Sequence, residues 1–146
     1  MNVDGVENGI VLDHIHPGRS MRLYDLLNLH ALDCPVAILK NVPSNKYGRK
    51  DIIKIDSHID VDLDACGFID PRITVNIVKN GKLVEKKHLE LPQRLVNIVS
   101  CRNPRCISVS ERGVEQIFLL TDTKTRQYRC LYCETAAERR RELGSL

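Results

Sequence analysis

In the first ninety positions, some hydrophobic residues follow the two-residue period of strands and others follow the spacing of helices. Together these patterns predict a β-sheet accompanied by helices. Runs with the alternation or β-branched content of strands occupy residues 9–15, 36–42, 50–56, 73–79 and 82–89. Residues 17–20 (PGRS) open a segment with leucines at helical spacing, and residues 58–68 can hold a second short helix. The order β-α-β-β-α-β-β predicts an open sheet with both helices packed on one face.

Turn-forming residues separate several of these strands. Asn80-Gly81 predicts a two-residue type I′ hairpin, and residues 43–45 (PSN) begin a polar loop after the second strand. Further along, residues 117–121 and 125–129 flank a polar turn and predict another hairpin.

Alternation within the strands also assigns polar side chains to a common face of each strand. The polar residues on such faces are Lys50, Lys54, Asn76, Lys82 and Lys86. A face of this kind could recognise a phosphorylated small molecule, because lysines act as point charges. Taken alone, the pattern is more typical of a solvated sheet face along which lysine stems lie.

The composition is that of a globular chain whose charge is unevenly distributed. The 146 residues are 42% hydrophobic and 28% charged, with a net charge of +3 that is too small to indicate nucleic-acid binding. Residues 1–91 carry 12 basic and 13 acidic residues, whereas residues 92–146 carry 10 and 6. This shift predicts a boundary near Pro92 and domains at 1–91 and 92–146.

The chain lacks the sequence features of membrane insertion and export. No stretch approaches 18 consecutive apolar residues, and the first nine residues include Asp4 and Glu7 but no basic residue. We therefore expect no transmembrane helix, no signal peptide, no membrane partner and a cytoplasmic location.

Two closely spaced cysteine pairs in the second part predict a metal site. Four residues separate Cys101 from Cys106, two separate Cys130 from Cys133, and 23 residues lie between the pairs. Two tight turns that each present two thiolates complete the tetrahedron that zinc prefers. No histidine follows His88, so a site confined to this part uses four cysteines, and we expect one structural zinc per chain.

Two other chemistries fit cysteines at this spacing. Disulfides need an oxidising compartment, which the lack of a signal-peptide pattern disfavours. A redox C-x-x-C motif would not need the matching pair at Cys101 and Cys106. We therefore favour zinc, and we interpret the isolated Cys34 and Cys66 as small buried hydrophobic residues.

The sequence contains none of the common catalytic motifs. Phosphate-binding, dinucleotide-binding, serine-hydrolase and metalloprotease patterns are all missing. Asp13 and His14 suggest an acid–base pair, but adjacent residues of a strand point to opposite faces, so we expect them not to meet. The sequence therefore predicts a noncatalytic protein.

Several segments together resemble the regulatory chain of aspartate carbamoyltransferase over nearly the whole sequence. They are residues 9–15 (GIVLDHI), 48–55 (GRKDIIKI), 74–76 (TVN) and 91–94 (LPQR), followed by the two cysteine pairs. The 48–55 run combined with the cysteine pairs is highly specific, whereas either half alone would be weak.

This resemblance implies an α+β chain in two domains. Residues 1–91 would form a nucleotide-binding domain, an open sheet with two helices on one face in a ferredoxin-like arrangement. Residues 92–146 would form a small all-β, zinc-ribbon-like domain that docks on the catalytic chain. The implied role is that of a noncatalytic allosteric subunit in de novo pyrimidine biosynthesis, with CTP, UTP and ATP as effectors and self-association through the N-terminal domain.

The resemblance also assigns site residues at positions that match the family's sites. The nucleotide-site residues are Asp13, His14, Lys50, Lys54, Asn76 and Lys86, with Val3, Asp4 and Val6 in an N-terminal arm over the base; the zinc ligands are Cys101, Cys106, Cys130 and Cys133. The strand alternation also groups Lys54, Asn76 and Lys86, which strengthens the phosphate-binding interpretation.

Two questions stay open at this point. Gly81 stands where some family members carry an aromatic residue near the base, which leaves the preference among CTP, UTP and ATP undecided. A different class, a zinc-ribbon protein that binds nucleic acid, draws support from the arginine-rich second part and a pI near 8.6. Aromatic residues are only 4% of the chain and offer few platforms for base stacking, so we expect no nucleic-acid partner. A thiol oxidoreductase is a weaker third alternative.

Overall fold

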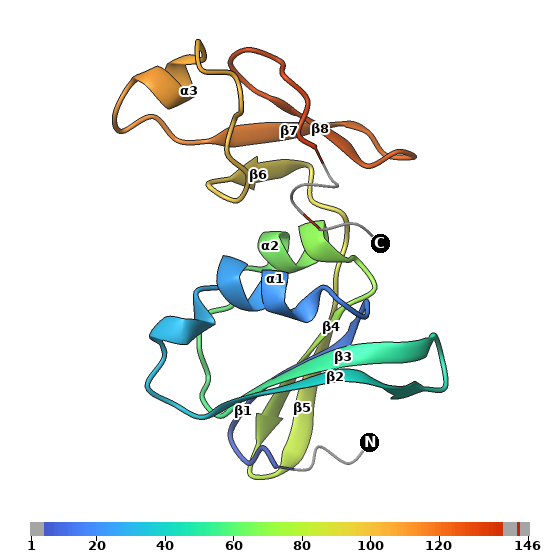
Figure 1. Cartoon of the computed structure of the whole chain (residues 1–146). Coiled ribbons are helices and arrows are strands. Elements are labelled where there is room, and N and C mark those ends of the chain that lie inside the picture. Colours follow the sequence, from blue (N-terminus) through green and yellow to red (C-terminus); the bar gives the residue numbers. More distant parts are fainter. Residues whose placement is uncertain (1–4, 139–142, 144–146) are drawn as a thin grey trace. The chain divides into compact units, whose positions relative to one another are not determined.

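The computed structural model describes residues 5–138 and residue 143 of the chain (Figure 1). The chain forms two compact units, Met1–Glu90 and Leu91–Leu146. Val3 and Asp4, two of the residues assigned to the nucleotide site, lie outside the described residues. No helix in the described part is long and apolar enough to cross a membrane.

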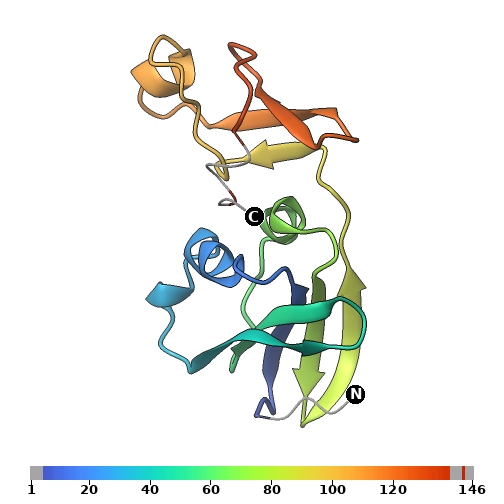
Figure 2. The ribbon, with the colours of Figure 1, turned by 45° about the vertical axis from the view of Figure 1, so that its right-hand side comes forward.

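The N-terminal unit is a five-stranded antiparallel sheet with its helices on one face (Figures 1 and 2). Its elements are β1 (Gly9–Ile15), α1 (Ser20–Leu26), the 3-10 turn η1 (Leu29–Ala31), β2 (Val36–Ser44), β3 (Gly48–Ile55), α2 (Leu63–Ile69), β4 (Thr74–Lys79) and β5 (Lys82–His88). The strand order is β2-β3-β1-β4-β5. Its first four members follow the ferredoxin-like order and β5 extends the sheet, which confirms the predicted fold class of this unit.

Apolar residues on the helix-covered face form the core of this unit. Leu12 of β1 is paired with Ile53 of β3 and Val75 of β4, and each of the three is at most 1% exposed. Leu23 of α1 and Phe68 of α2 are buried as well. Since α1 and α2 both lie on this side, the opposite face of the sheet, called the open face here, carries neither of them.

Several elements of this unit differ from their predicted bounds, and β2 and α2 show why. Strand β2 continues through Ser44, beyond the loop predicted to begin at Pro43, because its pairing with β3 resumes after a bulge. Helix α2 begins at Leu63, five residues later than predicted. The Asp62 carboxylate accepts a hydrogen bond from the Ala65 N–H and so caps the helix at this later point.

The described residues of the C-terminal unit include a three-stranded antiparallel sheet in the order β6-β7-β8 and a short helix after the first of these strands. Its elements are β6 (Arg94–Val96), α3 (Ile107–Ser110), β7 (Ile117–Asp122) and β8 (Gln127–Cys130). The predicted β7–β8 hairpin is present, and so is the β4–β5 hairpin, where Asn80 and Gly81 have φ values of 52° and 74°. The sequence pattern missed β6 and α3, because three or four residues are too few to display a period.

Candidate functional site

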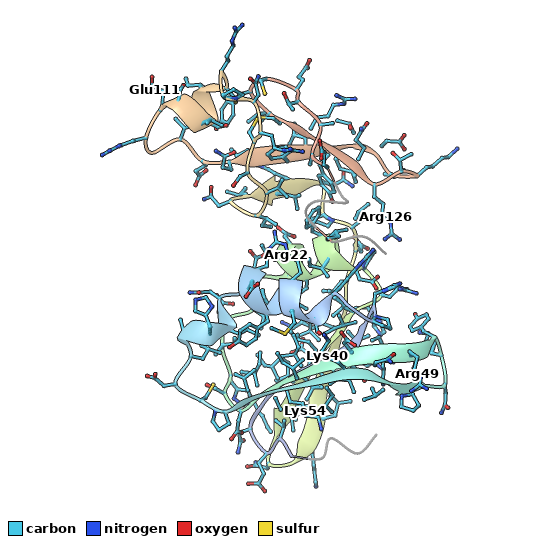
Figure 3. All side chains as sticks on the ribbon, viewed as in Figure 1. Arg22, Lys40, Arg49, Lys54, Glu111 and Arg126 are labelled. Atoms are coloured by element: carbon cyan, nitrogen blue, oxygen red, sulfur yellow. The ribbon has the colours of Figure 1, made fainter. Side chains whose placement is uncertain are left out.

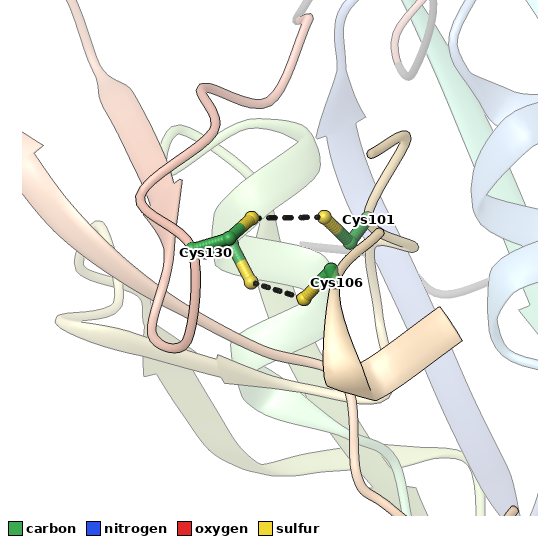
Figure 4. Close-up of side chains that lie close together, drawn as sticks. Cys101, Cys106 and Cys130 are labelled. Atoms are coloured by element: carbon green, nitrogen blue, oxygen red, sulfur yellow. Dashed lines mark hydrogen bonds between the residues drawn. The ribbon is translucent and has the colours of Figure 1, made fainter. Parts of the chain in front are cut away.

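The four cysteines of the C-terminal unit converge on one point (Figure 4). Cys106 directly precedes α3, and Cys130 is the last residue of β8. The Sγ atoms of Cys101 and Cys133 are 3.5 Å apart, and those of Cys106 and Cys130 are 3.7 Å apart. All four Sγ atoms lie within 4.8 Å of one another, so the fold joins the two cysteine pairs into one site.

These distances suit a single tetrahedral zinc ion. With Zn–S bonds of about 2.3 Å, the sulfur atoms at the corners of a tetrahedron lie about 3.8 Å apart. A disulfide would need an S–S distance of about 2.05 Å, and all six cysteines are free thiols. Four thiolate ligands leave no coordination position for water or substrate, so the site fits the predicted structural zinc.

The four thiols differ in how readily they lose a proton. Burial raises the pKa of Cys101 to about 12. Hydrogen bonding with the side chain and backbone of Thr135 lowers the pKa of Cys133 to about 6. Because zinc binds thiolates, its affinity for the site falls as protons compete for the sulfur atoms at low pH. Of the two ligands, Cys133 is therefore the one that more readily supplies a thiolate.

Gln116, which the sequence pattern did not single out, anchors the first cysteine pair to the sheet. Its Oε1 atom accepts a hydrogen bond from the Cys101 N–H at 2.8 Å, and its Nε2 atom donates to the Ser108 carbonyl at 2.6 Å. Its own N–H donates to the side chain of Asn97. The Ser108 hydroxyl lies 3.0 Å from the Cys106 Sγ atom. Gln116 thus positions the backbone on both sides of the metal ligands.

On the open face of the N-terminal unit, strand register lines up five residues in one row. Directly opposed positions, in the order β2-β3-β1-β4-β5, are Ala37, Lys54, Val11, Asn76 and Lys86. Directly opposed residues share a face of a sheet, so register brings these side chains together as the strand alternation predicts. We call this set the open-face row.

Asn76 is the polar residue at the centre of the open-face row, and its side chain lacks a partner. It is 0% exposed, yet neither its amide oxygen nor its amide nitrogen has a hydrogen-bond partner among the described residues. Leaving a buried polar group unsatisfied costs about 1–3 kcal/mol. A ligand that offers both a donor and an acceptor could remove this cost.

Next to the row, β1 is irregular at Asp13 and His14. Its pairing with β3 shifts register between Leu12 and Ile15, and His14 has a φ of 60°. Asp13 is paired with Thr74 of β4, and the His14 Nδ1 atom lies 3.2 Å from the Thr74 hydroxyl. The bulge therefore interrupts the alternation that predicted opposite faces for these adjacent residues, and the His14 ring reaches Thr74, the residue directly opposite Asp13.

An ion pair fixes the carboxylate beside this bulge. Lys50 Nζ lies 2.9 Å from Asp13 Oδ1, and the same oxygen accepts the His14 N–H at 2.7 Å. Burial lowers the pKa of the His14 imidazole; Asp13 opposes this shift, whereas Lys50, Lys86 and Lys46 add to it. His14 is therefore mainly neutral at pH 7 in the chain without ligand.

Apolar side chains lie beside the open-face row, on the side away from Asp13 and His14. Val6 packs with Val11 and Val78 in a small buried cluster. Beside it, a pocket of about 260 Å³ is lined by residues that include Val6, Ala37 and Lys54. Val6, predicted to belong to an arm over the site, therefore lies against the row.

Comparison with known proteins matches both units to one family. Residues 1–90 match the family model described as aspartate carbamoyltransferase regulatory chain, allosteric domain, and residues 93–142 match the metal binding domain of the same chain. A relative named aspartate carbamoyltransferase regulatory chain, from Bifidobacterium longum, is 41% identical over 94% of this chain and 99% of its own length. Relatives of the same name from Clostridium botulinum and Clostridium tetani are 40% and 41% identical, each over 92% of this chain and over 92% and 94% of their own length.

An allosteric domain joined to a closed metal-binding domain defines a noncatalytic regulatory subunit, as the sequence predicts. The chain belongs to the family of aspartate carbamoyltransferase regulatory chains, and its partner is a catalytic chain of that enzyme. Membership over both units confirms the resemblance drawn from the 48–55 run and the cysteine pairs. It also favours a regulatory chain over a zinc-ribbon protein that binds nucleic acid.

Replacing Gln116 by alanine should weaken zinc binding by about 10–100-fold, the usual effect of removing a group that orients metal ligands. Competition with a chromophoric chelator, applied to the full chain, measures this change. Gln93→Ala is the matched control, because Gln93 is an exposed glutamine of the same unit, and it should bind zinc like the unaltered chain. Equal zinc affinities for the two variants would show that Gln116 does not position the ligands.

Proposed function

We propose that the N-terminal unit binds a nucleoside triphosphate on its open face, and that binding changes the activity of the catalytic chain. The buried, unpartnered amide of Asn76, set in one row with Lys54 and Lys86, carries this proposal. A nucleotide supplies negative charge for the lysines together with donors and acceptors for the amide. The control that results belongs to de novo pyrimidine biosynthesis.

The basic residues around the open-face row would receive the phosphates and the ribose. Lys54, Lys86 and His14 would neutralise the phosphate charge. Hydrogen bonds between charged groups are stronger than those between neutral groups, so these contacts would contribute most to affinity. Asn76 and Asp13 supply hydrogen bonds to the sugar or the base. Lys50 acts as a supporting residue, because its ion pair with Asp13 holds that carboxylate in place.

The apolar end of the row would receive the base. The pocket beside Lys54 and the cluster around Val6 offer a surface suited to a flat, weakly polar ring. Val3 and Asp4, which the family resemblance assigns to the same site, lie outside the described residues. Gly81 contributes no aromatic surface, so we leave CTP, UTP and ATP together as the candidate effectors.

The C-terminal unit would provide the docking surface for the catalytic chain. Ile107 and Val109 of α3, and Leu131 and Tyr132 between the last two cysteines, are 40–50% exposed. Large apolar side chains of this kind near a rigid metal site are typical of protein interfaces. We assign docking to residues 92–146, and nucleotide binding and self-association to residues 1–91, in a cytoplasmic complex that bridges catalytic subunits.

The assembled enzyme tests the whole proposal. At least one of CTP, UTP and ATP should shift the substrate dependence of the catalytic chain when this chain is present and not when it is omitted. Couplings of this type are worth about 1–3 kcal/mol. The Cys130→Ser chain, which loses a metal ligand, should neither co-purify with the catalytic chain nor transmit the effect. A complex that responds to none of the three nucleotides would contradict the proposal.

Lys86→Gln should weaken effector binding by roughly 10–100-fold, because a hydrogen bond to a charged group contributes about 1.5–3 kcal/mol. Calorimetry on the zinc-loaded chain measures the affinity. Lys79→Gln is the matched control, since Lys79 is an exposed lysine at the end of β4 and should bind the effector normally. If both variants lost affinity equally, general charge and not the open-face row would explain binding.

Effector affinity should rise as the pH falls from about 8 towards 5.5. In the free chain burial keeps the His14 pKa below 6.5, and a bound phosphate would raise that pKa, so binding takes up a proton between the two values. The His14→Gln chain should show a weaker pH dependence, leaving only the titration of the nucleotide itself. Identical pH profiles for the two chains would exclude contact between His14 and phosphate.

A further inference from the structure

A second pocket, of about 290 Å³, opens at the end of β1 and gathers a different group of basic side chains. His14 and His16 reach it from β1 and the turn that follows, Arg49 from the start of β3, and Arg72 from the segment before β4. Tyr47 forms part of its wall. Among the described residues that line this pocket, none carries a carboxylate.

This second pocket is separate from the open-face row. Arg49 and Lys54 are five residues apart on β3, which is about 16 Å at 3.3 Å per residue. The odd spacing also points the two side chains to opposite faces of the strand, and Figure 3 shows them at different positions along β3. His14 is common to both regions, because it lines the pocket and also contacts Thr74 on the open face.

Two guanidinium groups are held in place at the second pocket. Nε and Nη2 of Arg72 donate to the Asp70 carboxylate at 3.1–3.2 Å, and its guanidinium carbon lies 4.7 Å from the centre of the Tyr47 ring. Arg49 Nη1 donates to the Asn41 carbonyl at 3.2 Å. A guanidinium has five N–H donors, so one partner does not exhaust it. Groups oriented in advance lose less entropy when an anion binds.

The backbone at the pocket is also strained in a way that is common at ligand sites. His14 is a non-glycine residue in the left-handed region, with a φ of 60°. The His14 and Tyr47 rings form a T-shaped contact, with their centroids 5.9 Å apart and an angle of 82° between the ring planes. This contact helps to orient the His14 ring. Such conformations cost of the order of 1–3 kcal/mol and cluster at active sites and ligand clamps.

We propose that the second pocket is an anion site that binds inorganic phosphate or a small phosphomonoester. Arg72 donates to Asp70 through Nε and Nη2, and Arg49 donates to Asn41 through Nη1; the remaining N–H donors of the two guanidinium groups match the oxygens of a phosphate group. His16 adds an imidazole to the same wall. The volume lies at the lower end of the range of about 300–1,000 Å³ for pockets that take drug-sized ligands, so it suits a compact anion.

Nuclear magnetic resonance of the zinc-loaded full chain tests this site directly. Inorganic phosphate and methyl phosphate are titrated separately at constant ionic strength, with the side-chain signals of His16 and Arg72 as the readout. Saturable shifts are expected, with at least tenfold weaker binding in Arg49→Gln and unchanged binding in Lys79→Gln. Tighter binding of methyl phosphate would identify a monoester as the ligand, and tighter binding of inorganic phosphate would identify the free ion.

Arg72→Gln should also lose phosphate binding, but it leaves the buried Asp70 carboxylate without its arginine. Arg49 is exposed, so Arg49→Gln still tests the site if the other variant does not fold. Shifts that grow linearly without saturating would overturn the proposal, and so would phosphate binding in Arg49→Gln as tight as in the unaltered chain. Because phosphate is the probe, a chain that fails to bind any nucleotide would leave this result standing.

Discussion

The pairing of β1 with β3 on one edge and β4 on the other is the constraint on which the N-terminal unit depends. A slip of one residue would carry Leu12 out of the core, so the hydrophobic face locks the register. The same register holds Val11 between Lys54 and Asn76. The bulge in this strand then interrupts the alternation at Asp13 and His14. Hydrophobic burial on one side of β1 therefore determines the spacing of the polar groups on the other side.

The C-terminal unit depends on coordination more than on burial. Its three short strands and the turn of α3 enclose only a small core, in which Phe118 and Tyr128 are the largest buried side chains among the described residues. A segment of this size rarely buries enough apolar surface to be stable alone, so metal binding contributes much of its folding free energy. The Tyr128 hydroxyl, which donates to the Pro92 carbonyl at 2.6 Å, fastens the start of the unit to its sheet.

Much of this organisation could be predicted from the sequence, because it depends on local periods and on ligand chemistry. The apolar run of β1, the Asn80-Gly81 turn and the cysteine spacing each allow few alternatives. The bulge at His14 could not be predicted, because it depends on contacts between strands. Asp51, buried opposite Ile15, accepts hydrogen bonds from backbone N–H groups in two other segments and braces the chain there.

Other site features also depend on the folded arrangement. Alternation identified Asn76 as a polar residue of the open face, but only the surrounding structure shows that its amide has no partner. Gln116 belongs to no sequence motif. Its role depends on the hydrogen bonds of its side chain with the Cys101 N–H and the Ser108 carbonyl. Arg72 lies outside the strands and helices, so hydrophobic periodicity says nothing about its contacts. Its stacking on the Tyr47 ring is visible only in the folded chain.

The wide separation of the two cysteine pairs has a consequence for the order in which the chain is built. The N-terminal unit is complete at about residue 90, but the metal site cannot close until Cys133 has been added, 43 residues later. At about 5–20 residues per second, translation gives the first unit a lead of roughly 2–9 seconds. During that interval Cys101 and Cys106 have no second pair to share a metal with. Zinc capture is therefore a late step, and it sets when the second unit becomes a folded body.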